Sequence, residues 1–292
     1  MRLVLPAYQP RAMPTLDPAL HHALHLQVTT ALDEDIGSGD LTALLIPADA
    51  QARAYVLCRE KAILCGQAWF EACFRQLDPA VAIRWYSQDG SCIGESQMLC
   101  EIQGNARALL SAERPALNFL QTLSATATLT RRYVDAIAGT GAVVMDTRKT
   151  LPGLRRAQKY AVLTGGGANQ RIGLYDGILI KENHIAAAGG IAQALTAATR
   201  VAGDVPVQIE VENQDELQQA LAAGAKLILL DNFSLNQLRE AVHLTAGRAV
   251  LEASGNITLD TIRSVAETGV QRISIGSLTK HIQAVDLSMR FE

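Results

Sequence analysis

Six short apolar runs in the second half of the chain each end in charged or small polar residues. Helical stretches separate the runs, which lie at 143–145, 178–180, 207–209, 227–230, 250–251 and 273–275. Short apolar runs that alternate with helices are typical of a parallel sheet, because each crossover lays a helix over the sheet and buries the strands. Closed into a ring, such a sheet is an α/β barrel. The predicted fold class is therefore α/β.

The number of runs is smaller than a complete barrel requires. Eight strands close a full α/β barrel, and the weak run at 162–164 fits the end of a helix better than a strand. Either one strand is hidden in a helical stretch or the barrel has fewer strands than usual.

The first half of the chain has a different pattern. Residues 20–33 read as a helix, and residues 51–103 read as short strands with turn signals around a helix at 67–76. This mixture predicts a separate α+β domain. A long helix expected over 106–138 leads from it into the barrel.

These patterns give three predicted segments. The N-terminal α+β domain takes residues 1–112 and the barrel takes residues 113–278. The amphipathic segment from Leu278 onward is expected to be helical, and residues 279–292 are expected to pack on the first domain.

Composition excludes several classes of partner. The chain has 292 residues, 49% of them hydrophobic, and a formal net charge of -3, so no overall basic excess exists to hold a nucleic acid or an anionic membrane. No apolar stretch reaches the roughly 18 residues of a membrane span, and the amino terminus lacks a signal-peptide core. We expect a cytoplasmic enzyme or binding protein.

The five cysteines all lie in the first half of the chain, at positions 58, 65, 73, 92 and 100. Their odd number and irregular spacing argue against a disulfide framework or a zinc site. We expect four of the five to be small buried residues in a reducing compartment.

A basic cluster lies between Asp146 and Lys181. This stretch has seven basic and two acidic side chains, a local charge of +5 in an acidic protein. Arginine and lysine at the rim of a barrel suit a polyanionic small molecule, because they bind carboxylates and phosphates. Three of the basic residues fit an outer helix face equally well: Arg155, Arg156 and Lys159.

Carboxylates follow the next two runs. Glu210 and Glu212 follow one run and Asp231 follows another. Carboxylates that face a basic pocket can hold Mg²⁺ or accept hydrogen bonds from sugar hydroxyls. The alternative is that they balance the lysines in structural ion pairs.

Small residues follow the last two runs, as Ser254-Gly255-Asn256 and Gly276-Ser277. Barrels often build a phosphate site there from backbone N–H groups. The glycines at 165–167 lack a nucleotide-binding spacing and are interpreted as a flexible loop that places Arg171. His184 fits either an acid/base group or a structural hydrogen bond.

Taken together, these residues resemble the quinolinate phosphoribosyltransferases, the carboxylating nicotinate-nucleotide pyrophosphorylases. The matching stretches span nearly the whole chain in order: 34–42, 113–121, 146–155, 165–169, 179–184, 210–212, 230–233, 252–255 and 276–281. The resemblance implies a two-domain protein whose incomplete, seven-stranded type of α/β barrel faces an open-sheet domain. It also implies the transfer of phosphoribosyl from phosphoribosyl pyrophosphate to quinolinate with loss of CO2, in NAD biosynthesis.

The resemblance also implies roles for individual residues. In a homodimer, Arg114 reaches into the partner's site. The dicarboxylate and diphosphate are bound by Thr147, Arg148, Lys149, Gln170, Arg171 and Lys181. Glu210 and Asp231 serve the ribose hydroxyls and the Mg²⁺ that accompanies the diphosphate. The 5-phosphate is held by Ser254, Gly255, Gly276 and Lys280. Asn256, Ser277 and Leu278 are further substrate-binding residues. The catalytic group comprises Lys149, Lys181, Glu210 and Asp231.

The sequence departs from the family pattern at Gln170, where histidine usually precedes the arginine. Glutamine can hydrogen-bond a carboxylate but cannot carry charge. Gln158 and Ala125 stand where glutamate and glycine are expected, and both fit as packing changes.

Other functions remain open from the residues alone. Lys181 at a strand end could form a Schiff base in a barrel lyase or aldolase. A phosphoribosyltransferase that uses nicotinate would need fewer arginines, because its substrate has one carboxylate. A non-catalytic ligand-binding relative is the third alternative, with Gln170 as the first change.

Overall fold

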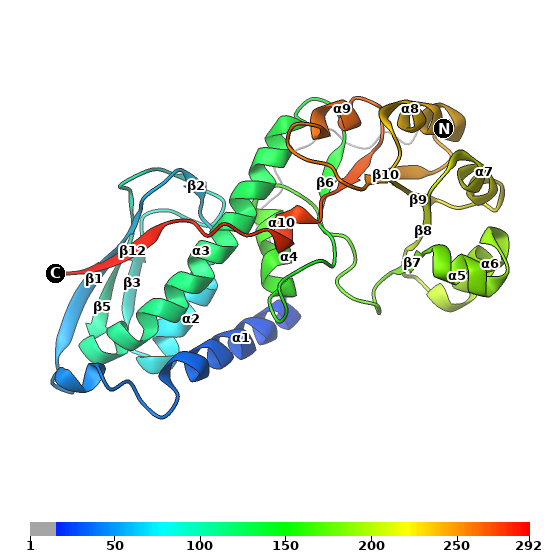
Figure 1. Cartoon of the computed structure of the whole chain (residues 1–292). Coiled ribbons are helices and arrows are strands. Elements are labelled where there is room, and N and C mark those ends of the chain that lie inside the picture. Colours follow the sequence, from blue (N-terminus) through cyan, green and yellow to red (C-terminus); the bar gives the residue numbers. More distant parts are fainter. Residues whose placement is uncertain (1–15) are drawn as a thin grey trace. The chain divides into compact units, whose positions relative to one another are not determined.

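The computed structural model describes residues 16–292 of the chain (Figure 1). These residues form two compact units, each built around its own sheet. The parallel-sheet unit takes residues 132–149 and 167–277, and the antiparallel-sheet unit takes 16–131, 150–166 and 278–292.

The parallel-sheet unit contains all six predicted strands. Across the sheet the order is β6-β11-β10-β9-β8-β7, and every pairing is parallel. The strands are β6 (Val143–Met145), β7 (Ile178–Ile180), β8 (Val207–Val211), β9 (Leu227–Asp231), β10 (Val250–Ser254) and β11 (Arg272–Ser274). Three of them extend further than the apolar runs, to Val211, Asp231 and Ser254.

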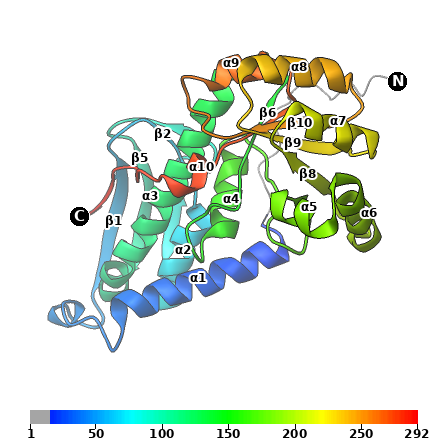
Figure 2. The same cartoon turned by 45° about the vertical axis from the view of Figure 1, so that its right-hand side comes forward.

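Helices cover the outer side of this sheet, as Figures 1 and 2 show. They are α5 (Glu182–Ala188), α6 (Ile191–Ala202), α7 (Gln214–Ala222), α8 (Leu235–Thr245) and α9 (Ile262–Ala266). Local sequence determines where they begin. Asn213 caps α7 by accepting the N–H of Glu216, and Ser234 forms a capping box with Gln237 at the start of α8.

The sheet is an open barrel rather than a closed one. Within residues 16–292 no pairing joins β6 to β7, the two outer strands of the sheet. Beside β6, Met145 and Ala168 form an isolated parallel bridge, with Ala168 N–H donating to Val144 O at 2.8 Å. This single-residue bridge stands where a seventh strand would begin. The shortage of strands in the sequence is thereby explained.

The antiparallel-sheet unit has a four-stranded sheet in the order β12-β1-β5-β3. These strands are β1 (Gln51–Cys58), β3 (Ala82–Trp85), β5 (Met98–Asn105) and β12 (Leu287–Phe291), and a separate pair joins β2 (Ala62–Ile63) to β4 (Cys92–Ile93). The helices are α1 (Pro18–Ile36), α2 (Gln67–Leu77), α3 (Ala106–Ala136) and α4 (Arg155–Thr164), with a 3-10 turn η1 (Ala43–Leu45). The helices predicted at 20–33, 67–76 and 106–138 are confirmed.

Aromatic side chains form the centre of this unit. Trp69 and Phe70 of α2 are completely buried, and Phe70 lies edge-on to Trp85 with ring centroids 5.3 Å apart. The indole N–H of Trp69 donates to Gln27 Oε1 of α1 at 2.7 Å, so its one polar atom is satisfied inside the core.

The C-terminal segment is not the helix that its pattern suggested. A short helix α10 (Ser277–Lys280) is followed by strand β12, which pairs antiparallel with β1 so that Met289 lies opposite Val56. Leu287 and Met289 are buried and Ser288 between them is not, which is the alternation of a half-buried strand. The helix prediction for 278–292 was therefore wrong beyond Lys280.

The domain boundaries at 112 and 278 stay a prediction. Helix α3 runs without a break through residue 113, and compactness within one chain does not decide which segments fold alone.

The cysteines lie as predicted. Cys58, Cys65, Cys73 and Cys100 are buried and Cys92 is exposed, all as free thiols. Burial raises the pKa of the Cys73 thiol to about 12, which keeps it protonated and unreactive. No helix in the described part of the chain is long and apolar enough to span a membrane.

Candidate active site

The predicted site residues of the parallel-sheet unit follow or end its strands. Thr147, Arg148 and Lys149 follow β6, Lys181 follows β7, and Gly276 and Ser277 follow β11. Glu210, Asp231 and Ser254 lie within the last two residues of β8, β9 and β10. Asp231 and Ser254 are opposite each other in the pairing of β9 with β10. Because parallel strands end at one edge of the sheet, these residues share one rim.

Charges change in order along this rim. The outer strands β6 and β7 carry Lys149 and Lys181, the inner strands β8 and β9 carry Glu210 and Asp231, and β10 and β11 lead into glycines. In sheet order the rim therefore runs from Lys149 past the glycines to the two carboxylates and ends at Lys181, so both of its edges are basic.

Lys181 and Glu210 form an ion pair between β7 and β8. The Lys181 Nζ lies 2.8 Å from Oε2 and 2.9 Å from Oε1 of Glu210. The lysine side chain is 48% exposed, so solvent and ligands can reach it. His184 has a structural role in this arrangement, because its Nδ1 accepts the backbone N–H of Lys181 at 3.1 Å.

The end of β6 lies close to the end of β11. The Thr147 hydroxyl accepts the backbone N–H of Lys149 at 3.1 Å. A side chain at Gly276 would place its Cβ 3.2 Å from Lys149 Cδ and 3.7 Å from Thr147 Oγ1. Glycine at 276 therefore leaves room for the lysine stem to pass over the backbone.

Arg171 is held in place by its own loop. Its guanidinium donates to Gly177 O at 3.0 Å, and Asp176 closes the loop by accepting the N–H groups of Ile172 and Gly173. Burial and the positive charge of Arg148 lower the pKa of Arg171. Two guanidinium groups close enough to repel each other form a site that favours an anion.

The acidic part of the rim has the opposite field. The pKa of the exposed Glu212 is raised, first by the charge of Glu182, with smaller effects from burial, Glu216, Asp231 and Glu210. A divalent cation would relieve this mutual repulsion. Within residues 16–292, however, no three His, Cys, Asp or Glu side chains converge on one possible metal position. The residues fit a cation that shares its ligands with a bound substrate.

The glycine-lined part of the rim is closely packed. Asn232, at a positive φ of 57°, donates from Nδ2 to Asp231 Oδ2 at 2.8 Å. Gly255 has a φ of 100°, and a Cβ there would overlap the side-chain oxygen of Asn232 and lie 2.9 Å from its backbone nitrogen. Glycine at 255 is thus required both by its backbone conformation and by the space available.

Three polar side chains meet beneath the rim: Gln170, Gln208 and Glu252. We call them the floor cluster. The pattern of strand ends in the sequence did not predict that they would meet. The Gln170 amide nitrogen donates to both carboxylate oxygens of Glu252, and Gln208 Nε2 donates to Glu252 Oε2 at 3.1 Å. Glu252 was expected to follow its strand, but it lies within β10 and is 1% exposed. The sequence contained one signal for this cluster. Gln208 and Glu252 are polar and each lies two positions before a predicted rim residue, on the same side of its strand.

Three predicted residues belong to the antiparallel-sheet unit. Leu278 and Lys280 lie in α10, and Leu278 is completely buried. Arg114 lies in α3 with a side chain that is 58% exposed, 4.0 Å from Glu113. Its role in binding stays a prediction.

Gly165 has a packing function in addition to its place in the loop predicted for this glycine run. It ends α4, and a Cβ at this position would lie 2.5 Å from Ala127 O and 2.6 Å from Thr130 Cβ of α3. Glycine therefore allows the end of α4 to approach α3 closely.

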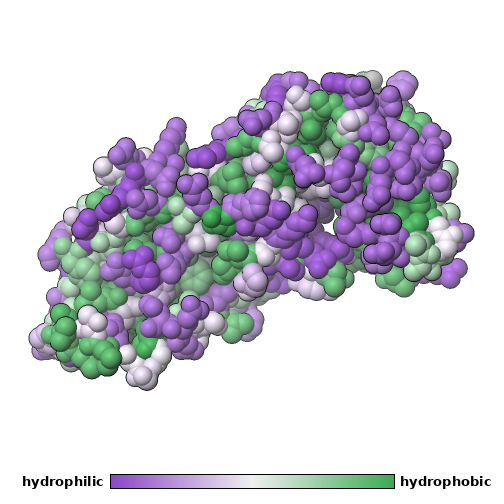
Figure 3. Space-filling model, in the orientation of Figure 1, coloured by the Kyte–Doolittle hydropathy of each residue, from purple (hydrophilic) through white to green (hydrophobic). Residues whose placement is uncertain are grey.

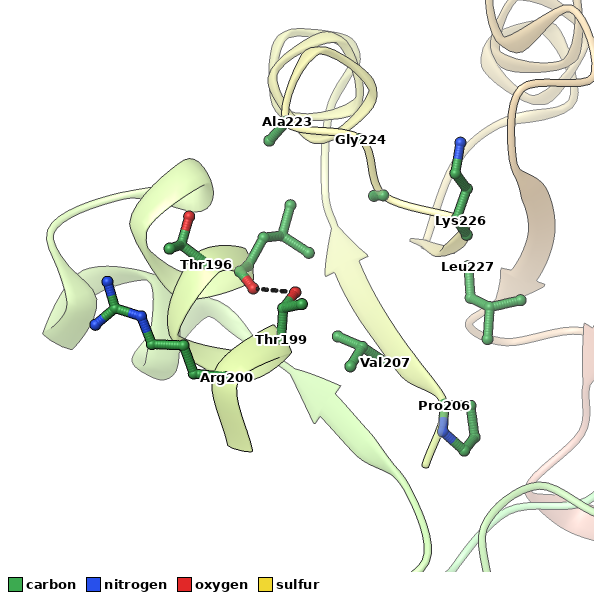
Figure 4. Close-up of a pocket in the computed structure, with 11 residues that line it drawn as sticks. Thr196, Thr199, Arg200, Pro206, Val207, Ala223, Gly224, Lys226 and Leu227 are labelled. Carbon is green, nitrogen blue, oxygen red and sulfur yellow. Dashed lines mark hydrogen bonds between the residues drawn. The ribbon is translucent and has the colours of Figure 1, made fainter. Parts of the chain in front are cut away.

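A cavity of about 640 Å³ lies at the opposite end of the sheet, before β8 and β9 (Figure 4). Pro206, Val207 and Leu227 line it, and the Thr199 hydroxyl donates to Leu195 O at 2.8 Å. Figure 4 shows the Arg200 and Lys226 side chains extending away from Val207. The cavity lacks the paired charges of the rim, so the rim is the better candidate site.

Known proteins resemble this chain over nearly its whole length. The quinolinate phosphoribosyl transferase N-terminal domain matches residues 40–124 and the C-terminal domain matches residues 126–290. A probable nicotinate-nucleotide pyrophosphorylase (carboxylating) of Bacillus subtilis is 42% identical over 270 residues, covering 91% of this chain and 93% of that protein. A quinolinate phosphoribosyltransferase (decarboxylating) of Nicotiana glauca is 39% identical over 305 residues, covering 97% of this chain and 85% of its own length.

The fold agrees with the sequence comparison. The structure of the nicotinate-nucleotide pyrophosphorylase from Francisella tularensis superposes with a TM-score of 0.90 at 43% identity, covering 96% of this chain and all of that one. Both domains of the family are matched in order, and the similarity extends through both units. The chain belongs to the quinolinate phosphoribosyltransferase family.

Proposed function

We propose that this chain transfers phosphoribosyl from phosphoribosyl pyrophosphate to quinolinate, with decarboxylation, to give nicotinate mononucleotide, pyrophosphate and CO2. This is the carboxylating nicotinate-nucleotide pyrophosphorylase reaction of NAD biosynthesis, named in reverse. The observation that carries the assignment is the order of charges along one rim, in a chain with full-length similarity to this family.

The basic residues at the two edges of the rim serve the anions. Arg148 and Arg171 bind the two carboxylates of quinolinate, with Gln170 beside them, because a guanidinium pairs with a carboxylate through two N–H groups. Thr147, Lys149 and Lys181 bind the diphosphate and neutralise the charge that develops on it as it leaves.

The acidic region serves the sugar. As the bond to the diphosphate breaks, positive charge develops on the anomeric carbon and ring oxygen of the ribose. Glu210 and Asp231 hold the ribose hydroxyls and stabilise this charge electrostatically while the quinolinate nitrogen attacks the anomeric carbon. No covalent enzyme intermediate is needed.

Decarboxylation follows from the new bond. The ring nitrogen becomes a positively charged pyridinium, which stabilises the carbanion left on the adjacent carbon when CO2 departs. A proton then replaces the lost group. The protein needs only to orient the departing carboxylate and to supply the proton.

Glu210 and Asp231 are the residues that would hold Mg²⁺, shared with the oxygens of the diphosphate. The cation supplies charge neutralisation for the leaving group. Two carboxylates and the diphosphate together provide the oxygen ligands that Mg²⁺ prefers.

The 5-phosphate fits the glycine-lined part of the rim. Ser254, Gly255, Asn256, Gly276 and Ser277 offer backbone N–H groups and hydroxyls without a side chain that would block the approach of an anion. Leu278 and Lys280 follow in α10, and we assign them to the same phosphate.

The active assembly is a homodimer in which Arg114 serves the partner's site. Figure 3 shows apolar side chains gathered over the end of the antiparallel-sheet unit that contains η1. Leu41, Leu44 and Leu45 are 81%, 63% and 81% exposed, a concentration of exposed leucine that favours coverage by a second copy. We place the enzyme in the cytoplasm, where its five thiols stay reduced.

The test is an assay of the purified protein with quinolinate, phosphoribosyl pyrophosphate and Mg²⁺, in which nicotinate mononucleotide, pyrophosphate and CO2 should form in equal amounts. No turnover of quinolinate, or equal turnover of nicotinate, would overturn the substrate assignment. The aldolase alternative is disfavoured because the Lys181 amine is ion-paired with Glu210 and is not free to attack a carbonyl. Borohydride trapping of a carbonyl substrate on Lys181 would revive it.

A further inference from the structure

The floor cluster lies directly beneath the rim. In a strand, residues two apart point to the same side, so Gln208 lies under Glu210 on β8 and Glu252 lies under Ser254 on β10. The rise of a strand places this layer roughly 7 Å below the rim. Gln208 is 7% exposed and Glu252 is 1% exposed, so both are shielded from bulk water.

Glu252 is satisfied by neutral donors from different parts of the chain. Gln170 donates to both of its oxygens and Gln208 donates to one, while the Ser274 hydroxyl of β11 donates to Ala253 O at 3.5 Å. The charged group that faces it is Arg272, which favours the ionised form. Burial has the larger effect and raises the pKa of Glu252.

Gln170 is held at both ends. Its side-chain nitrogen reaches down to Glu252, and its backbone N–H donates to Asp146 Oδ1 at 2.8 Å. Asp146 is completely buried, at the end of β6. The next residue in the chain is Arg171, so two buried carboxylates fix the segment from which that guanidinium extends.

We infer that Glu252 is a positioning residue for substrate binding, because its carboxylate anchors the Gln170 side chain and thereby orients the segment that presents Arg171 to quinolinate. The inference rests on the proposed function of the rim. It also explains how this chain works with glutamine at position 170. A neutral amide can hold a buried carboxylate only through hydrogen bonds, and Gln208 supplies the additional amide donor.

The first test replaces the acceptor without changing its size. In Glu252→Gln, one acceptor oxygen becomes an N–H donor that faces the Gln170 amide, so Gln170 loses one of its two bonds to this residue and its anchor is weakened. We expect the KM for quinolinate to rise roughly tenfold to 100-fold, as a misplaced binding group does, while the KM for phosphoribosyl pyrophosphate stays within about twofold. Gln208→Leu keeps the volume but removes the donor to Glu252 and the acceptor that Gln208 Oε1 offers to Gln170 at 3.3 Å. It should give a smaller rise in the same KM.

The pH dependence separates positioning from packing. Protonation of Glu252 removes an acceptor from Gln170, so the wild-type KM for quinolinate should rise as the pH falls through the raised pKa of Glu252. In Glu252→Gln, which has no carboxyl group at this position to titrate, the KM for quinolinate should rise less over the same pH range. Equal KM values in wild type and Glu252→Gln, or an equal rise for both substrates, would overturn the inference.

A second measurement does not depend on turnover. Hydrogen exchange of the Gln170 backbone N–H should be roughly tenfold faster in Glu252→Gln than in wild type, because the segment opens more easily without its anchor. Unchanged exchange at residues 168–172 would contradict the inference even if the wild type proved inactive with quinolinate. Wild-type turnover together with unchanged variants would overturn the inference alone and leave the proposed function intact. Should Glu252→Gln fail to fold, Gln208→Leu carries the same three measurements.

Discussion

Lys181 Nζ and the Glu210 carboxylate form the ion pair that joins the basic part of the rim to the acidic part, with N–O distances of 2.8 and 2.9 Å. The proposed reaction separates the two: Lys181 turns to the diphosphate and Glu210 to the ribose and its cation. Their attraction to each other holds both side chains over the site until the substrate provides new partners.

Loss of either partner should therefore affect turnover more than stability. We expect Lys181→Met and Glu210→Gln each to lower kcat/KM by about 10²-fold to 10³-fold, the range for removal of one preorganised charge at a transition state. The free energy of unfolding should change by about 1 kcal/mol or less, since the lysine is half exposed. Steady-state kinetics and urea unfolding measure the two effects.

The matched control is Arg263→Met, which breaks an exposed ion pair of 2.7 Å with Glu267 in the same unit, away from the rim. It should leave kcat/KM unchanged. Wild-type activity in Lys181→Met would remove this lysine from the mechanism.

Gly255→Ala should specifically impair use of the ribose phosphate. The new methyl group would overlap Asn232, which bonds Asp231, and alanine is strained at a φ of 100°. We expect the KM for phosphoribosyl pyrophosphate to rise at least roughly tenfold, because the displaced loop no longer fits the phosphate. Gly247→Ala, also at a positive φ but with nothing within 4 Å, controls for backbone strain alone. Equal kinetic effects of both substitutions would contradict a role for the contact.

Mixed dimers test whether sites are shared between subunits. Arg114→Ala and Lys181→Ala subunits should each be inactive as homodimers, while a mixture should regain activity because one site in each mixed dimer is intact. Under random exchange of equal amounts, about a quarter of the wild-type activity is expected. Activity that stays at the level of the two separate preparations would show that each site is built within one subunit.

Thiol reactivity tests the packing of the antiparallel-sheet unit. A thiol reagent at mildly alkaline pH should modify one cysteine per native chain, Cys92, and all five after unfolding. Burial raises the pKa of the other four thiols, so thiolate is scarce at those positions. In Cys92→Ser the fast phase should vanish, and a second fast thiol would reveal local opening of the unit.

Asp89 should make stability fall as the pH rises. Burial raises its pKa above the ordinary 3.8, although the N–H groups of Gly66 and Gln67 and the hydroxyl of Tyr160 oppose the shift. A carboxyl with a raised folded pKa contributes stability that is full below the unfolded pKa and is lost as the pH rises through the folded pKa. The unfolding free energy of wild type relative to Asp89→Asn should therefore decrease from about pH 4 upward.

Asp40 provides a control of opposite sign in the same unit. Hydrogen bonds from Ala43, first, and from Ser111 and Thr42 lower its pKa below 3.8. Its contribution is present above the unfolded pKa and is lost as the pH falls through the folded pKa, so the wild type relative to Asp40→Asn should gain stability with rising pH. Slopes of the same sign in both series would contradict the assigned causes.

Local pattern was sufficient to predict the sheet and its rim. Ile228 and Leu230 on one side and Leu229 on the other are all apolar because β9 is buried on both faces, and such runs are visible without any knowledge of their neighbours. The rim residues follow from the same runs, since each strand ends where its apolar residues give way to polar ones.

The floor cluster could not be predicted in that way. Glu252 looks like the end of a strand, and only its contacts with Gln170 and Gln208, 82 and 44 residues away, allow β10 to continue through a buried carboxylate. The helix prediction for the C-terminal segment was wrong for a related reason. Leu287 and Met289 alternate as in a strand, but a five-residue segment shows too little of this period to outweigh the helical pattern expected from Leu278 onward, and pairing with β1 decides the outcome.

The pairing of β6 also determines when this sheet can be completed during synthesis. Apart from its one-residue bridge to Ala168, β6 pairs within the described chain only with β11, about 130 residues further on. At ribosomal rates those residues take roughly 6 to 26 s to make. Throughout that interval the apolar edge of β6 is available to the wrong partners. In some proteins the outermost strands pair with strands that are close in sequence. Compared with such proteins, this nascent chain should depend more on chaperones or on slow release from the ribosome.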